Sequence, residues 1–475
     1  ILGDKELVSD SKSLIKLPFK GAAKEAGNVK ALGSAAIGAL LKLIGLELSH
    51  TEGVVSEIFH NEAIATQNFE AIKKGYELTS KKYSTKAPGI DGRILINGNE
   101  AIALGALASG CKFYSAYPMT PSTSIMNYLA TKIHEAEIVV EQAEDEIAAI
   151  NMAIGASYAG VRSMTGTSGG GFSLMVEAVG LSGMMEIPLV IAEIQRPGPV
   201  TGLPTRTEQS DLKFVISCSQ GEVPRMVIAL KTPEDAFYQT ARAFDLAYKY
   251  QIPVILLGDQ FLADYTTAIK PFDFDKVKIE NYYKNDDYIN NEYIRYSITE
   301  DGISPMIIPG KTPGRTVLVD SDEHDETGHI TESSEVRIRM ADKRLRKLET
   351  LRNDILEPEF IGADSFHILL VAWGSTYGPV REAVEVLNKN GDTKYAALVF
   401  GDIWPLPTRT LLEKASPGIK IINIEQNATG QLASIITECT GIKCSKSILK
   451  YDGRQLSGDE IVEKLKELNK EGYHG

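Results

Sequence analysis

Residues 139–160 read Val-Val-Glu-Gln-Ala-Glu-Asp-Glu-Ile-Ala-Ala-Ile-Asn-Met-Ala-Ile-Gly-Ala-Ser-Tyr-Ala-Gly. The pattern predicts a short strand that ends near Glu141, and then a helix over Asp145–Gly160. The helix is rich in Ala and Gly, and small side chains allow close packing in a protein interior. We therefore expect a strand–helix unit with Glu146 at the junction.

The same alternation extends on both sides of this stretch, and it predicts a parallel, doubly wound α/β sheet. The expected strands are Lys112–Ser115, Glu137–Glu141, Ser163–Thr167, Leu189–Gln195, Arg225–Leu230 and Pro253–Gly258. The expected helices are Ala101–Gly110, Ser122–His134, Asp145–Gly160, Phe172–Met185 and Pro233–Tyr250.

Changes in composition and hydrophobic pattern divide the 475 residues into four parts. Residues 1–85 are helix-rich, with helices expected over Asn28–Leu46 and Glu57–Gly75, and a polar linker is expected at Lys81–Pro88. Residues 86–270 hold the α/β pattern. Residues 271–365 read as a long polar connection that ends in a charged helix, and residues 366–475 form a second, smaller α/β domain.

Composition excludes several classes of protein. The net charge of -13 argues against nucleic acid or an anionic membrane as the main partner. The longest uncharged stretch, 113–131, holds two prolines and many hydroxyls, so it is a poor membrane span. The four cysteines are scattered, which favours a reduced, cytoplasmic setting. The chain opens at Ile1 in what reads as the middle of a domain, so we expect an N-terminal portion to precede it.

Glu146 is the strongest candidate for a catalytic residue. A carboxylate between a strand end and a close-packed helix would be partly withdrawn from water and could hold or share a proton. A helix dipole also favours acids in the first turn, which would explain Glu144, Asp145 and Glu146 without any function. The spacing alone favours this second interpretation.

The stretch Tyr117-Pro118-Met119-Thr120-Pro121-Ser-Thr-Ser124 follows one strand and precedes a helix. Its prolines fix the loop, and we expect at least one of its hydroxyls to cap the helix. A rigid loop at the carboxyl end of a parallel strand is also where α/β folds bind ligands. The two interpretations are compatible.

Two further segments could contact a ligand. Arg196 follows an apolar strand and is held by Pro197-Gly-Pro199, so its guanidinium could pair with a carboxylate, although it could equally be a surface arginine. Thr167-Ser168-Gly169-Gly-Gly171 could approach a flat ligand or an anion, although a plain tight turn would look the same. His324 and His329 stand among acids, but such loops are usually only solvated, so we expect no metal there.

These motifs together resemble the α subunit of the 2-oxoacid:ferredoxin oxidoreductases, which are thiamin-diphosphate enzymes. Residues 95–270, approximately, resemble the family's pyrimidine-binding domain. The motifs that carry this resemblance occur in the family's order and spacing: Gly98-Asn-Glu-Ala, Tyr117–Pro121, Glu144–Glu146, Thr167–Gly169 and Arg196–Thr205. Met119 and Val200 replace the usual Ile and Ser. Residues 366–475 resemble the family's transketolase C-terminal-like domain, and residues 1–85 resemble the tail of a fused γ domain.

The resemblance implies a role for each motif. Glu146 would be the catalytic acid, hydrogen-bonded to the cofactor's aminopyrimidine, with Thr167, Ser168 and Gly169 also binding the cofactor. Thr120, Arg196, Tyr117 and Pro118 would bind the 2-oxo acid. The implied reaction is oxidative decarboxylation, with the acyl group passed to coenzyme A and electrons passed to ferredoxin.

A second polypeptide is expected on the same grounds. The chain has neither a four-cysteine set for an iron–sulfur cluster nor a motif of the G-D-G…N type for diphosphate and Mg²⁺. The resemblance therefore places Mg²⁺ and the 4Fe–4S cluster on a β subunit, without which this chain would be inactive. The alternatives are another thiamin-diphosphate enzyme of transketolase or decarboxylase type, or a non-catalytic protein of the same fold. Among substrates, 2-oxoglutarate or a broad range is favoured over pyruvate.

Overall fold

The computed structural model describes residues 2–6, 14–49, 51–84, 92–390 and 393–470. The chain divides into two compact units, Ile1–Gly92 and Arg93–Gly475. The predicted linker Lys81–Pro88 lies partly outside the described residues. No helix in the described ranges is long and apolar enough to cross a membrane.

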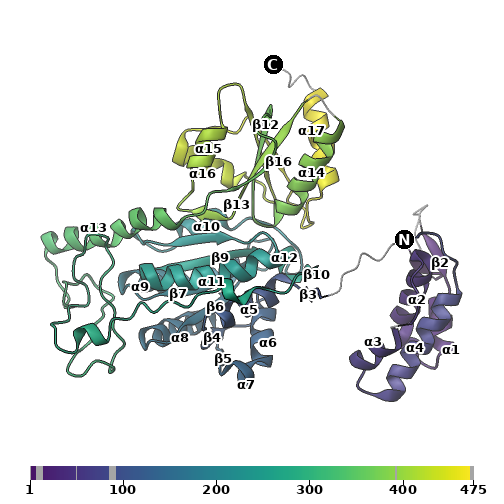
Figure 1. Ribbon diagram of the computed structural model, residues 1–475, viewed down its shortest axis with the longest axis horizontal. Helices are drawn as coiled ribbons and strands as arrows, with labels where there is room; N and C mark the ends of the chain where they lie inside the picture. The colour runs from purple at the N-terminus through teal and green to yellow at the C-terminus, as the bar shows by residue number, and fades with distance from the viewer. Residues whose placement is uncertain (1, 7–13, 50, 85–91, 391–392, 471–475) are drawn as a thin grey trace. The chain divides into compact units, whose positions relative to one another are not determined.

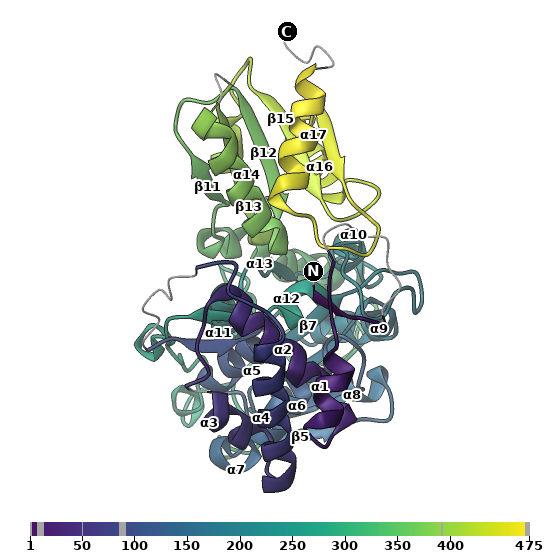
Figure 2. The ribbon, with the colours of Figure 1, turned by 90° about the vertical axis from the view of Figure 1, so that its right-hand side faces the viewer.

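The first unit is a small helical body with one pair of parallel strands (Figure 2). Helices α2 and α4 cross at backbone distance, because a Cβ on Gly38 would overlap the carbonyl oxygen of Ile72 and a Cβ on Gly75 would overlap that of Ala35. The two glycines therefore decide how closely these helices pack. The elements are β1 (Leu2–Asp4), β2 (Ile15–Leu17), α1 (Phe19–Glu25), α2 (Leu32–Ile44), α3 (Thr51–Ile58) and α4 (Glu62–Glu77).

A seven-stranded sheet forms the centre of the second unit (Figure 1). Its order is β14-β8-β9-β7-β6-β4-β5, and every pairing is parallel except that of β14 with β8. The predicted doubly wound sheet is confirmed. Its strands are β4 (Phe113–Ala116), β5 (Val139–Gln142), β6 (Ser163–Thr167), β7 (Leu189–Gln195), β8 (Met226–Ala229), β9 (Pro253–Asp259) and β14 (Asp402–Trp404).

Helices cover both faces of this sheet. One face packs against α5 (Gly98–Ala108), α6 (Thr123–Thr131) and α11 (Pro233–Tyr250). The other packs against α8 (Glu146–Tyr158), α9 (Gly169–Met184) and α10 (Leu212–Ser217). Short elements complete this region: α7 (Ile133–Ala136), α12 (Gln260–Asp264), and the antiparallel pair β3 (Ile94–Ile96) with β10 (Thr267–Ile269).

Some helix starts follow the local sequence, and one does not. Asn97 and Glu100 form a capping box on α5, and Thr232 caps α11 through its side chain, as its sequence predicts. The predicted hydroxyl cap on α6 is wrong. Ser122 is its N-cap residue, but the hydroxyl donates to the Met119 carbonyl at 2.8 Å, so the loop bonds to itself and the helix begins without a side-chain cap.

The C-terminal region, residues 355–470, has a five-stranded sheet of its own with the order β11-β13-β12-β15-β16. It also contributes β14 to the larger sheet. Asp402 of this strand forms a bidentate ion pair with Arg242, with both N···O distances at 2.7 Å. One buried apolar cluster runs through both domains. The elements are β11 (Glu359–Gly362), β12 (Ile368–Trp373), α14 (Tyr377–Asn390), β13 (Tyr395–Phe400), α15 (Arg409–Lys414), β15 (Lys420–Glu425), α16 (Gln431–Thr440), β16 (Lys446–Leu449) and α17 (Gly458–Lys470).

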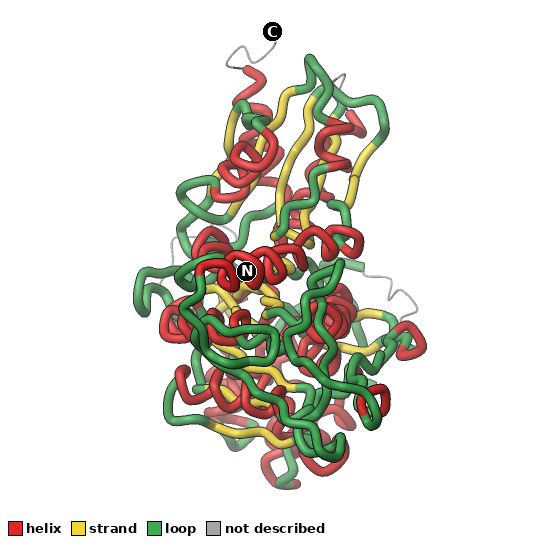
Figure 3. The backbone as a smooth tube through the Cα atoms, turned by 90° about the vertical axis from the view of Figure 1, so that its left-hand side faces the viewer, coloured by secondary structure: helices red, strands yellow, loops and turns green. Residues whose placement is uncertain are grey.

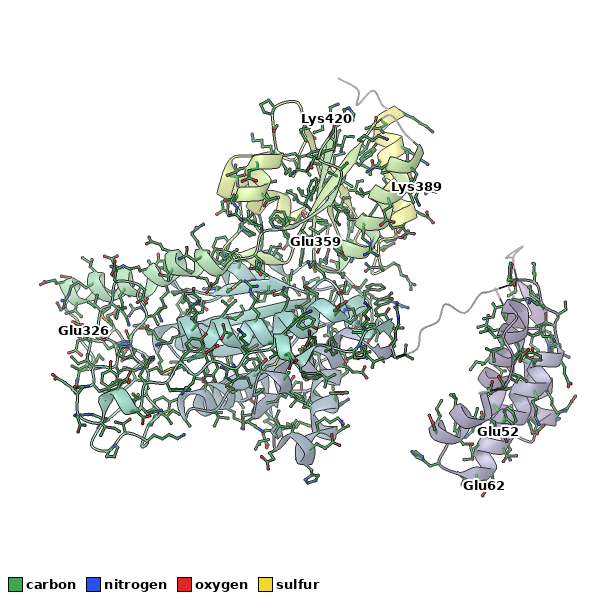
Figure 4. The ribbon with its side chains drawn as sticks, viewed as in Figure 1. Glu52, Glu62, Glu326, Glu359, Lys389 and Lys420 are labelled. Carbon is green, nitrogen blue, oxygen red and sulfur yellow. The ribbon has the colours of Figure 1, made fainter. Side chains whose placement is uncertain are left out.

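The two domains are further joined at Glu359, which is labelled in Figure 4. Its carboxylate accepts from Lys231 of the larger domain and from Tyr377 of its own, each at 2.8 Å.

Residues 271–333 are almost entirely loop, drawn in green in Figure 3. Isolated bridges join Tyr283 to Met306 and His324 to Ile330. Glu326, labelled in Figure 4, helps to hold the segment by accepting from the Ile298 backbone N–H at 2.9 Å. The charged helix predicted near 335–355 is α13 (Ser334–Leu351).

A buried ion cluster fastens α13 to the sheet domain. Glu186 follows α9 and forms ion pairs with the ammonium groups of Lys343 and Lys347 at 2.6 and 2.5 Å, with all three side chains buried. Burial alone would raise the pKa of Glu186, but Lys343, Lys347 and Arg295 hold that pKa well below its usual range. Burial lowers the pKa of Lys347 to about 7. One carboxylate thus compensates several buried cations.

We predict that Glu186→Gln destabilises the second unit by roughly 3–5 kcal/mol, because the buried ammonium groups lose their counter-charge. Chemical denaturation of the full chain, followed by tryptophan fluorescence, measures the change. Glu385→Gln is the matched control, since its ion pair with Arg381 on α14 is exposed and 3.9 Å long. Equal stability of the two variants would contradict the assigned role of Glu186.

Candidate active site

Four predicted segments meet at one edge of the large sheet. The 117–121 loop follows β4, Glu146 comes after β5, Thr167–Gly171 leave β6, and Arg196 follows β7. These strands are parallel and adjacent, so their carboxyl ends share one edge. The sequence predicted this placement of each segment.

Glu146 is the first residue of α8, and its side chain turns inward, with only 4% of the residue exposed. Asp145 caps the helix, so Glu146 is not needed for capping. Its Oε1 atom is buried and has no hydrogen-bond partner among the described residues. A buried carboxylate oxygen without a donor is rare in folded proteins and costs stability unless something else satisfies it.

A glycine allows this carboxylate to pack directly against the backbone of α9. A Cβ on Gly171 would overlap both Glu146 Oε1 and Thr167 Oγ1, so position 171 cannot carry a side chain. Thr167 Oγ1 also lies 3.9 Å from the Met119 sulfur. The structure therefore brings Glu146, Thr167 and the 117–121 loop together.

Arg196 lies at the same edge of the sheet, directly after β7. Its Nη1 donates to the Thr120 carbonyl oxygen at 2.6 Å, which ties the two predicted substrate segments to each other. Its Nε is buried and has no acceptor in the described part of the chain. The guanidinium thus keeps a free donor in the interior.

The remaining predicted residues differ in their surroundings. Ser168 is fully buried, and its hydroxyl has no partner among the described residues. Gly169 begins α9 and lies against the Asp211 carboxylate. Tyr117 is exposed and Pro118 half-buried, and neither has a described side-chain contact with Glu146.

Sequence reasoning missed a buried acid pair behind this edge. Glu193 lies within β7 with no exposed surface, and neither of its carboxylate oxygens has an N–H or hydroxyl donor among the described groups. The carboxyl group of Asp211 lies close enough to affect its ionisation. A charged residue inside an otherwise apolar strand was the signal that could have found it.

Two carboxyl groups can make such a contact only when one of them carries a proton. Burial, together with Asp211 and Asp259, raises the pKa of Glu193 well above its usual range, and burial raises the pKa of Asp211 to about 6. The pair therefore holds one proton at neutral pH. Since a Cβ on Gly169 would overlap Asp211 Oδ2, the pair also supports the Thr167–Gly171 turn.

The C-terminal domain helps to place Asp211. Gln209 donates to the Trp373 carbonyl at 2.9 Å, and the Gln431 amide donates to the Ser210 carbonyl at 2.6 Å. Glu425, the last residue of β15, is fully buried and accepts from the Trp373 indole at 3.1 Å and from two backbone N–H groups in the first turn of α16. The loop before Asp211 is therefore fixed by the second domain.

The histidine loop lies apart from this edge in the sequence and in its contacts. His324 is buried, with Nδ1 at 2.9 Å from the Asp322 carbonyl, and burial lowers its pKa. His329 is exposed beside Thr327. Within the described residues no group of three or more His, Cys, Asp or Glu side chains is gathered for a metal ion, and the four cysteines are free thiols.

Family models match both units of the chain. The model described as "Pyruvate flavodoxin/ferredoxin oxidoreductase, thiamine diP-bdg" matches residues 104–343. The model described as "Pyruvate ferredoxin/flavodoxin oxidoreductase" matches residues 4–78. The fold and the site thus define a chain of the thiamin-diphosphate-binding oxidoreductase class.

The chain belongs to the family of 2-oxoacid:ferredoxin oxidoreductase α subunits. It is 37% identical over 452 residues to "2-oxoacid:ferredoxin oxidoreductase 1, subunit alpha" of Sulfurisphaera tokodaii, covering 91% of this chain and 70% of the relative. It is 32% identical over 377 residues to "2-oxoglutarate synthase subunit KorA" of Methanothermobacter thermautotrophicus, covering 79% of this chain and 98% of the relative.

A solved structure supports the same assignment. The 2-oxoglutarate:ferredoxin oxidoreductase from Magnetococcus marinus, with 2-oxoglutarate, coenzyme A and succinyl-CoA bound, matches with a TM-score of 0.90 and 34% identity. The match covers 98% of this chain and 82% of that one.

We predict that Glu193→Gln flattens the pH dependence of stability. Folding takes up a proton at the acid pair because the unfolded carboxyls ionise at lower pH, so stability falls as pH rises above the unfolded pKa. The slope for one proton is about 1.4 kcal/mol per pH unit. The amide of Gln can donate to Asp211 without that proton.

Denaturant unfolding at pH 5.5, 6.5 and 7.5 measures the difference between the variant and the parent chain. Glu177→Gln, at an exposed position on α9, should keep the parent slope. If Glu193→Gln also keeps the parent slope, the pair does not hold a proton.

Proposed function

We propose that this chain is the α subunit that binds the 2-oxo acid and the pyrimidine half of thiamin diphosphate in a coenzyme A-dependent, ferredoxin-reducing oxidative decarboxylase. The observation that carries the proposal is the buried, partnerless Oε1 of Glu146, which packs against Gly171. A carboxylate held dry at such a point can hold or release a proton at one fixed atom, which is the property that acid–base catalysis requires.

The residues at this edge fit the cofactor. The orphaned oxygen of Glu146 offers one hydrogen-bonding atom, and the Ser168 hydroxyl offers a second. Glu146, Thr167, Ser168 and Gly169 would hold the aminopyrimidine. Thiamin diphosphate, when bound, supplies the electron sink that decarboxylation of a 2-oxo acid needs.

Arg196 and Thr120 are the proposed substrate-binding residues, with Tyr117 and Pro118 beside them. The free Nε–H of Arg196 is a charge-assisted donor suited to a substrate carboxylate. The 2.6 Å bond from its Nη1 to the Thr120 backbone fixes the direction of the guanidinium. Arg196 would orient the substrate, while Glu146 would hold or release the proton.

A partner subunit would complete the site. Each of the four segments that meet at Glu146 carries or adjoins an exposed apolar side chain: Tyr117, Ile147, Leu174 and Val200, the last with 84% of its surface exposed. Clustered exposed apolar groups typically mark protein interfaces. We assign this surface to a β subunit, which would hold the diphosphate with Mg²⁺ and the 4Fe–4S cluster.

We propose 2-oxoglutarate as the preferred 2-oxo acid, or a broad range that includes it, with pyruvate next. The names of the Methanothermobacter relative and of the Magnetococcus structure support this order. Coenzyme A as acyl acceptor and ferredoxin as electron acceptor follow from the same names. A cytoplasmic location stays a proposal that rests on cysteine usage.

Glu146→Gln in the assembled enzyme should lower the rate of 2-oxoglutarate-dependent methyl viologen reduction by roughly 10²–10⁴-fold, because the amide cannot exchange the proton. Copurification with the β subunit should be unchanged. Glu144→Gln, exposed and two residues upstream, is the control and should keep the parent rate. Full activity of the Glu146 variant would refute the assigned role.

Arg196→Lys should raise the KM for the 2-oxo acid by at least about ten-fold, since a lysine cannot keep both the Thr120 bond and a second donor. The kcat should change less than the KM. A panel of 2-oxoglutarate, pyruvate and branched-chain 2-oxo acids, assayed with both enzymes, measures the effect and ranks the substrates. An unchanged KM for every acid would exclude Arg196 from substrate binding.

A further inference from the structure

The 117–121 loop carries Thr120, whose side chain is exposed at the sheet edge. Two side chains that are distant in the sequence donate to successive carbonyl oxygens of this loop. Arg196 donates to the carbonyl of Thr120 at 2.6 Å. Asn99 donates through Nδ2 to the carbonyl of Pro121 at 2.8 Å. Arg196 has a place in the proposed function, whereas Asn99 does not.

The orientation of the Asn99 amide is set by the acceptor that it faces. A carbonyl oxygen can only accept, so the NH2 group must face Pro121. The second N–H of the same group donates to the Ser124 hydroxyl at 2.7 Å. Both N–H groups are therefore used at the point where the loop passes into α6.

Asn99 belongs to a helix that is closely packed on its neighbours. It is the second residue of α5, whose start is fixed by the capping box. A Cβ on Gly98 would overlap the carbonyl oxygen of Leu262 in α12. A Cβ on Gly105 would overlap that of Phe237 in α11. Helix α5 therefore packs at backbone distance against two helices, and the fully buried Asn99 is fixed relative to the sheet.

The same arrangement leaves one polar atom of Asn99 unsatisfied. Its Oδ1 is buried and has no hydrogen-bond partner among the described residues, which costs stability. A leucine of similar shape would remove that cost, although it would leave the Pro121 carbonyl without this donor. Because the two effects oppose each other, the main contribution of Asn99 is to the position of the loop rather than to the stability of the fold.

We propose that Asn99 is a positioning residue for the 2-oxo acid. It fixes the Pro121 carbonyl and thereby sets where the Thr120 side chain and the Arg196 guanidinium meet the substrate. The inference rests on the proposed function, because only that function places a 2-oxo acid at Thr120 and Arg196. Asn99 itself is buried and acts through the loop without touching the substrate.

The proposal also gives a role to each of the first three residues of the Gly98-Asn-Glu-Ala motif. Gly98 allows the close contact with α12, and Glu100 completes the capping box. Asn99 lies between them and holds the loop. The first and third residues thus fix the start of α5, and the second transfers that fixed position to the substrate loop.

Hydrogen–deuterium exchange of the assembled enzyme without substrate tests the position of the loop independently of activity. In Asn99→Leu, the backbone amides of 117–124 should exchange at least about five-fold faster than in the parent, because the loop loses an anchoring bond. Asn388→Leu is the matched control. Asn388 on α14 also donates to a backbone carbonyl, that of Tyr395 at 2.9 Å, but it lies in the C-terminal domain, so exchange at 117–124 should not change.

Methyl viologen reduction by the same variants tests the effect on the substrate. Asn99→Leu should raise the KM for the preferred 2-oxo acid roughly five- to ten-fold, as expected for one lost hydrogen bond, with kcat within about two-fold of the parent. Asn388→Leu should keep the parent KM. In the double variant Asn99→Leu/Arg196→Lys, the rise in KM should be at least about three-fold smaller than the product of the single rises, because both residues act through one loop.

Thermal melting and copurification with the β subunit show whether each variant is folded and assembled, and Asn99→Ala is the second variant if Asn99→Leu does not fold. The proposal is overturned if the folded Asn99 variant exchanges the 117–124 amides as slowly as the parent. An unchanged KM, a fall in kcat alone, or a double variant that shows the full product of the single effects also overturns it. If the parent oxidises no 2-oxo acid, the proposed function fails and the substrate role of Asn99 fails with it, while the exchange rates still decide whether Asn99 fixes the loop.

Discussion

One carboxylate with no partner organises the functional edge of this chain. Glu146 is buried at the start of α8, its Oε1 has no donor in the described structure, and it packs against Gly171, where a side chain would overlap it. A fold normally removes such a group or satisfies it, because a buried unpaired polar atom costs stability. Its presence beside Thr167, with the bond from Arg196 to Thr120 joining the loops that follow β7 and β4, is what makes this edge a site rather than a packed strand end.

Three buried glutamates show how surroundings decide what a carboxyl group does. Glu186 is surrounded by lysines, remains ionised, and fastens α13 to the sheet domain. Glu193 meets only other acids, so its pair with Asp211 holds a proton. Glu425 is fully satisfied by side-chain and backbone donors and fixes the junction of the two domains. Glu146 differs from all three because its partner is missing from the chain itself, as expected for a residue that serves a ligand.

The C-terminal domain is part of the site's support. It adds β14 to the large sheet, and it holds the segment before Asp211 through contacts with Gln209 and Ser210. The supporting contacts of the site in this chain therefore extend across two domains. A change in the relative position of these domains would affect the acid pair behind the Thr167–Gly171 turn.

The sequence determined the alternation of strands and helices, the placement of Glu146, Thr167 and Arg196 at strand ends, and the family, because these depend on local periodicity and on motifs that stay together along the chain. Only the tertiary structure decided that β14 joins the first sheet, that Ser122 does not cap α6, and that Glu193 lies beside Asp211. Those facts depend on which distant segments become neighbours, and on which donors burial leaves without acceptors. Local sequence patterns determine neither which distant segments become neighbours nor which buried groups lack a partner.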